Sequence, residues 1–102
     1  MVEALDRMWA RFLPQMLERV AILESASAAL ANGNLNVEQR GAANSAAHKL
    51  AGVLGTFGLT KGTVLAREAE ILYSGEQETD PESAQRLGSI AAQLRVLVEQ
   101  RR

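Results

Sequence analysis

Apolar residues recur every three to four positions along four stretches of this 102-residue chain, a spacing that gives a helix one apolar face. Such faces are stable only when they are buried against one another. Aromatic residues make up 4% of the chain, which favours helix over sheet, and a chain of this length usually forms one domain. The pattern predicts an all-α protein in which residues 1–102 form a single antiparallel, up-down four-helix bundle.

Capping residues and a helix breaker set the first boundaries. The first helix is expected over residues 2–31, kinked or split near Pro14, because proline lacks the backbone N–H and clashes with the preceding turn. Asn36, with Gln39 three residues later, forms a capping-box pattern for a second helix over residues 37–57.

The remaining boundaries follow in the same way. Gly58 is well placed to end the second helix, and Thr60 to cap the third, which extends to about Tyr73. Asp80 followed by Pro81 is a start signal for the fourth helix. The two arginines at its C-terminal end suit the negative end of the helix dipole.

The composition limits the chemistry that the fold can carry. The chain has no cysteine, one histidine and a formal net charge of −1, which excludes disulfides, thiolate nucleophiles, cysteine-ligated metals and a basic surface for nucleic acid. No apolar run approaches the roughly 18–20 residues of a membrane span, and the acidic start is unlike a signal peptide. We expect a monomeric, cytoplasmic protein with no metal or other cofactor, which binds neither nucleic acid nor membranes.

The one histidine, His48, lies on an unusual helix face. The residues three, four and seven positions away share this face and are all small; they are Gly41, Asn44, Ser45, Ala51, Gly52 and Gly55. An ordinary solvated face carries longer polar side chains, and each interior glycine costs about 1 kcal/mol relative to alanine. The pattern therefore indicates an imidazole that another macromolecule can approach closely.

The stretch from Ala46 to Leu59 resembles the signature of histidine-containing phosphotransfer (HPt) domains, and most closely that of chemotaxis-type histidine kinases. Five residues fall in register with the family pattern: His48, Leu50, Gly52, Gly55 and Gly58. The motif-bearing match extends to about Leu72. The resemblance implies a four-helix domain of a bacterial two-component system.

The resemblance also implies roles for single residues. His48 would be phosphorylated, and Glu70 on the following helix would accept a hydrogen bond from Nδ1, leaving Nε2 as the nucleophile. The family usually has a lysine where this chain has Ala51. The candidate cations for the phosphoryl oxygens are therefore Lys49, Arg67 and Lys61.

The implied partners are protein domains. The donor would be a receiver domain carrying an aspartyl phosphate, or a histidine kinase, and the acceptor would be a response-regulator receiver. Mg²⁺ would belong to the receiver. The partner would dock on the small-residue face, at Asn44, Ser45, Ala51, Gly52 and Gly55, while Trp9 and Phe12 are expected mainly in the core.

Two other interpretations of the residues stay open. A single histidine on a helix is often an ordinary surface residue, so a non-catalytic helical scaffold, or a degenerate HPt domain, would keep the same apolar stripes. A hydrolase that uses Ser45 with His48 is disfavoured, because the two residues lie one turn apart on one helix and no oxyanion donors are evident.

Overall fold

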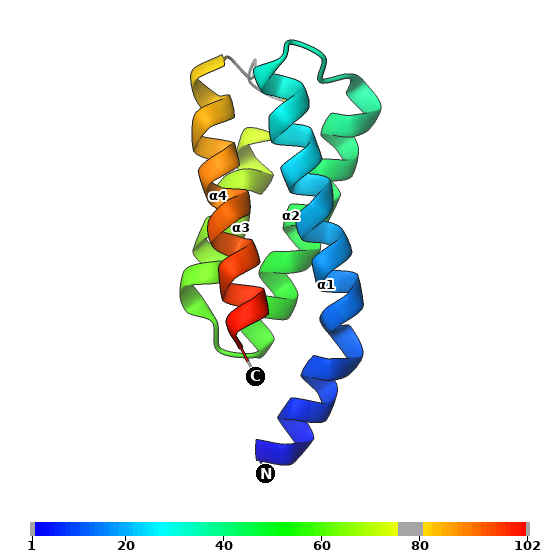
Figure 1. The fold of residues 1–102 in the computed structure, drawn as a ribbon, viewed down its shortest axis with the longest axis vertical. Helices are drawn as coiled ribbons and strands as arrows, with labels where there is room; N and C mark the ends of the chain where they lie inside the picture. The colour runs from blue at the N-terminus through cyan, green and yellow to red at the C-terminus, as the bar shows by residue number, and fades with distance from the viewer. Residues whose placement is uncertain (1, 76–80, 102) are drawn as a thin grey trace.

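Four α-helices make up almost all of the computed structural model, which describes residues 2–75 and 81–101. They are α1 (Val2–Ala31), α2 (Val37–Thr56), α3 (Thr60–Leu72) and α4 (Pro81–Gln100). The helices run alternately up and down, with α1 and α4 in front of α2 and α3 (Figure 1), and both α1 and α3 pack against α2 and α4. The predicted all-α four-helix bundle is confirmed. No helix in the described ranges is long and apolar enough to cross a membrane.

The core lies where the four apolar stripes meet. The largest fully buried side chains are Met16, Val20, Leu23, Leu50, Leu54, Tyr73, Leu87, Ile90, Leu94 and Val98. Burying an aliphatic side chain of this size stabilises the fold by about 1.5–3 kcal/mol. Gly62 brings α3 close to α2, because a Cβ at this position would lie 2.9 Å from Leu54 Cδ1.

The first helix is bent but not split at its proline. Pro14 lies inside the continuous α1 helix, so the expected break is wrong and the expected bend is present: Figure 1 shows the axis changing direction in the blue part of the ribbon. Pro14 is exposed. The backbone hydrogen bond that proline removes is therefore lost on the solvent side, where it costs least.

The N-terminal part of α1 projects beyond the other helices (Figure 1). Leu5 and Met8, which the spacing placed on the apolar stripe, are therefore 45% and 43% exposed. Burial begins at Trp9, whose ring packs edge-on against Phe57 with 5.0 Å between centroids. The Arg101 guanidinium lies 4.8 Å from the centre of the Trp9 ring and covers this contact.

The predicted capping of α2 is confirmed at both ends. The Asn36 side chain accepts from Gln39 N at 2.7 Å, and the Gln39 side chain accepts from Asn36 N at 3.0 Å. The helix ends at Thr56, one residue earlier than expected. Gly58 has a φ of +73°, and Leu59 N donates to a carbonyl of the last turn, the arrangement of a Schellman motif.

Thr60 does not cap α3, contrary to expectation. Leu59 occupies the N-cap position, with no side-chain cap, and Thr60 is the first helical residue. The reason is the tight turn after α2, which leads directly into the next helix. The predicted cap Asp80 lies outside the described residues. Arg101, one of the two arginines expected at the negative end of the helix dipole, directly follows the last residue of α4.

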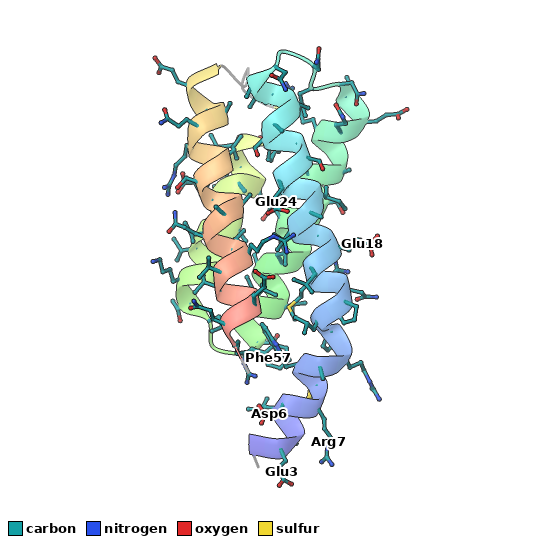
Figure 2. All side chains as sticks on the ribbon, in the orientation of Figure 1. Glu3, Asp6, Arg7, Glu18, Glu24 and Phe57 are labelled. Carbon is teal, nitrogen blue, oxygen red and sulfur yellow. The ribbon has the colours of Figure 1, made fainter. Side chains whose placement is uncertain are left out.

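Two bidentate ion pairs fasten α4 to its neighbours. Arg95 donates from Nε and Nη2 to Glu24 of α1 at 2.7 and 2.8 Å, and Figure 2 labels Glu24 on the part of α1 beside α4. Arg86 donates in the same way to Glu68 of α3 at 2.5 and 2.6 Å. Hydrogen bonds from the arginines lower the pKa of both carboxyl groups. These pairs lie at the solvent-facing surface, where water screens the attraction between the charges, so they add little to the stability of the fold.

Replacing Tyr73 by phenylalanine should protect the fold at alkaline pH. Tyr73 is 1% exposed, its hydroxyl has no partner among the described residues, and burial raises its pKa from 10.0 to about 12. The unfolded chain therefore loses the phenolic proton first, and stability falls as pH rises through this interval. Urea denaturation of both proteins at pH 8 and pH 11.5 should show a smaller loss for Tyr73→Phe. Equal losses of stability in the two proteins would contradict the raised pKa of Tyr73.

Candidate active site

His48 lies in the middle of α2 with its side chain 71% exposed. The opposite face of the same helix is anchored in the core, where Ala47, Leu50 and Leu54 are completely buried. The imidazole is therefore an accessible group on a backbone that close packing holds in place.

The Nδ1 atom of His48 is held by Glu70 of α3, with 2.8 Å between Nδ1 and Oε2. An ionised carboxylate only accepts hydrogen bonds, so this contact places the ring proton on Nδ1. In the neutral ring, Nε2 then carries the free lone pair. The side chain of Glu70 is only 27% exposed, and the partly enclosed carboxylate faces a ring that is open to solvent.

Two further hydrogen bonds fix α3 against α2 on either side of this contact. Asn44 Nδ2 donates to the Glu70 backbone carbonyl at 2.8 Å, and Thr63 Oγ1 donates to the Ala51 carbonyl at 3.2 Å. Sequence reasoning placed Asn44 on the docking face and assigned no contact to Thr63. The spacing of seven residues between Thr63 and Glu70 could have indicated the Thr63 contact, because it puts both residues on one side of α3, the side that faces α2.

The exposed positions that share the His48 face of α2 carry no long side chain. Gly52 and Gly55 are exposed, as are Gly41 and Ser45. A Cβ at Gly41 or Gly52 would meet nothing within 4 Å, and one at Gly55 would meet only Thr63 Oγ1 at 3.4 Å. Packing within this chain therefore does not require glycine at position 41 or 52.

Ala51 does not belong to this exposed surface, contrary to expectation. It is 3% exposed. A step of three residues along a helix falls about 60° short of a full turn, and here that rotation carries Ala51 under the α2–α3 contact. The Ala51 side chain is therefore covered by α3 in this structure and adds no exposed surface for a partner.

The three candidate cations are all exposed but lie on different sides of the bundle. Lys49 lines a groove of about 320 Å³ between α1 and α2, together with Glu18 and Ile22. Lys61 lines a hollow between α3 and α4. Arg67 lies on α3 between Thr63 and Glu70, which hydrogen-bond to α2. None of the three makes a hydrogen bond or an ion pair with any described residue.

Comparison with known proteins gives a consistent result. A family model described as "Hpt domain" matches residues 7–100. The chain is 36% identical over 90 residues to Protein RcaC of Microchaete diplosiphon, and the match covers 88% of this chain but 14% of that protein. No solved structure matches the chain.

Replacing Gly52 by alanine should raise the free energy of unfolding by about 0.5–1 kcal/mol, because alanine is the better helix former and the site is open. Urea denaturation measures the change. Gly62→Ala is the matched control and should gain less stability than Gly52→Ala, since its Cβ would lie 2.9 Å from Cδ1 of the fully buried Leu54, which would have to shift. A loss of stability in Gly52→Ala would show that the fold itself needs this glycine.

Proposed function

The chain belongs to the Hpt domain family, and we propose from this premise that His48 accepts a phosphoryl group on Nε2 and passes it to the aspartate of a response-regulator receiver. The observation that carries the proposal is the state of the ring. It is 71% exposed, and its Nδ1 is occupied by Glu70 at 2.8 Å. Only Nε2 is then available as a nucleophile.

The proposed reaction needs little from this chain beyond the oriented ring. The Nε2 lone pair forms a bond to phosphorus while the bond from phosphorus to the aspartyl oxygen of the donor breaks, and the carboxylate leaves. The proton stays on Nδ1, so the ring gains a positive charge that the Glu70 carboxylate stabilises. The reverse step delivers the group to the next receiver. Phosphoryl transfer depends mainly on positioning and charge stabilisation, and Mg²⁺ on the receiver would supply the latter.

The cleared surface beside His48 supports close docking of a partner. Nucleophile and phosphorus have to approach to about 3–3.5 Å, and the exposed Ser45, Gly52 and Gly55 present no long side chain that would keep a partner away. The half-buried Asn44 borders the same surface. We assign these four residues to the docking surface, and Lys49 to its edge on the α1 side.

The donor is either a receiver aspartyl phosphate or the ATP-binding domain of a histidine kinase. The chain spans only 14% of the length of the curated relative that it matches, so the partners of that longer protein do not identify those of this chain. As part of the same proposal, we expect the chain to be a monomer in the reducing cytoplasm of a bacterium.

Labelling tests the proposal directly. Incubation with Mg²⁺ and a receiver domain carrying a ³²P-labelled aspartyl phosphate should transfer label to the wild-type chain and not to His48→Gln. The product should be alkali-stable and acid-labile, since it contains a P–N bond. Circular dichroism controls for the fold of the variant. If neither several receivers nor a kinase domain with ATP labels the wild type, a non-catalytic interaction domain becomes the better interpretation.

Removing the carboxylate that holds the ring should slow transfer. In Glu70→Ala we expect roughly a 10-fold lower rate of phosphoryl transfer, the equivalent of about 1.4 kcal/mol for one charge-assisted hydrogen bond. Glu68→Ala is the matched control, because Glu68 lies on the same helix but pairs with Arg86. Rapid-quench measurement of both variants separates the site effect from a general loss of charge. Equal rates in the two variants would remove the orienting role of Glu70.

A further inference from the structure

We propose that Arg67 binds the phosphoryl oxygens once His48 is phosphorylated. This inference rests on the proposed function, since it concerns the phosphorylated state of the same ring. It assigns to α3 a cation that α2 does not place on this side of the ring, because Ala51 is a buried alanine and Lys49 lines the groove toward α1.

The contacts between α2 and α3 set the level of Arg67 along the bundle. The two helices run antiparallel, with Glu70 against His48 and Thr63 against the Ala51 carbonyl. Arg67 lies between Thr63 and Glu70 in the sequence, and each residue advances a helix by 1.5 Å. Its Cα is therefore level with the segment of α2 from His48 to Ala51.

The rotation about α3 sets the side on which Arg67 lies. Residues three and four positions apart lie next to each other on a helix, with about 5–6 Å between their Cβ atoms. Arg67 is thus adjacent to both Thr63 and Glu70, whose side chains contact α2. Ala66 and Ala69 are buried and lie on the core side of the line through Thr63 and Glu70, whereas Arg67 is exposed. It therefore occupies the outer edge of the α2–α3 contact, beside the exposed imidazole.

The charges around a phosphorylated ring would favour a cation on this side. A phosphoryl group on Nε2 would bring two negative charges close to the Glu70 carboxylate, which already lies 2.8 Å from Nδ1. A guanidinium donates in a fork that matches phosphoryl oxygens. Arg67 has no hydrogen bond or ion pair to any residue that the structure describes, so it is available. Lys49 and Lys61 line hollows on the α1 and α4 sides instead.

A titration of the phosphorylated ring tests this contact without any partner protein. Potassium phosphoramidate can phosphorylate histidine directly, and ³¹P NMR follows the second ionisation of the phosphoryl group on His48, with His48→Gln identifying the resonance. A nearby cation lowers the pKa of an acid. We expect Arg67→Gln to raise the phosphoryl pKa by about half a unit or more, and Arg67→Lys to give a smaller rise.

Lys61→Gln is the matched control, because it removes one positive charge from the same helix on the side facing α4. It should leave the titration unchanged. An Arg67→Gln titration that coincides with the wild type, or a rise of equal size in Lys61→Gln, would overturn the role of Arg67 while leaving the phosphorylation of His48 intact. If neither phosphoramidate nor several phosphorylated receivers, nor a kinase domain with ATP, modify His48 of the wild type, both the proposed function and this inference fail.

Discussion

The hydrogen bond between His48 Nδ1 and Glu70 is the interaction on which the site depends. It joins α2 to α3, and under the proposed function it keeps the ring proton on Nδ1. The surrounding structure supports this one contact: Asn44 holds the backbone of Glu70, and Gly62 allows α3 to approach α2 closely. Without that approach, a glutamate on α3 would be one more solvated charge on the surface of a bundle.

The small residues of the site are better explained by access than by stability. Glycine in a helix interior costs about 1 kcal/mol relative to alanine, and at Gly52 the fold gains no closer packing in return, since a Cβ there would meet nothing within 4 Å. Gly62 is different, because its missing Cβ admits Leu54. The missing Cβ thus serves core packing at Gly62, whereas at Gly52 it supports the proposed access of a partner.

Local patterns predicted the elements better than their mutual placement. The apolar spacing gave the four helices, and the Asn36–Gln39 pair gave the start of α2, because both depend on residues close in sequence. The exposure of Leu5 and Met8 depends instead on how far α1 extends beyond its neighbours, and the burial of Ala51 on the rotation of α2 against α3. Glu70 was expected opposite His48 mainly through the family resemblance, since its place on one face with Thr63 allows this contact but does not distinguish it from a surface glutamate.

We propose that Glu70 fixes the proton of His48 on Nδ1 and leaves Nε2 as the nucleophile. Long-range ¹H–¹⁵N NMR correlations of the unphosphorylated protein measure this directly, because the two ring nitrogens have distinct shifts in each tautomer, and His48 is the sole histidine in the chain. We expect the Nδ1–H tautomer for the neutral ring, and a shift toward the Nε2–H tautomer in Glu70→Ala. A wild-type ring that carries its proton on Nε2 would contradict this proposal.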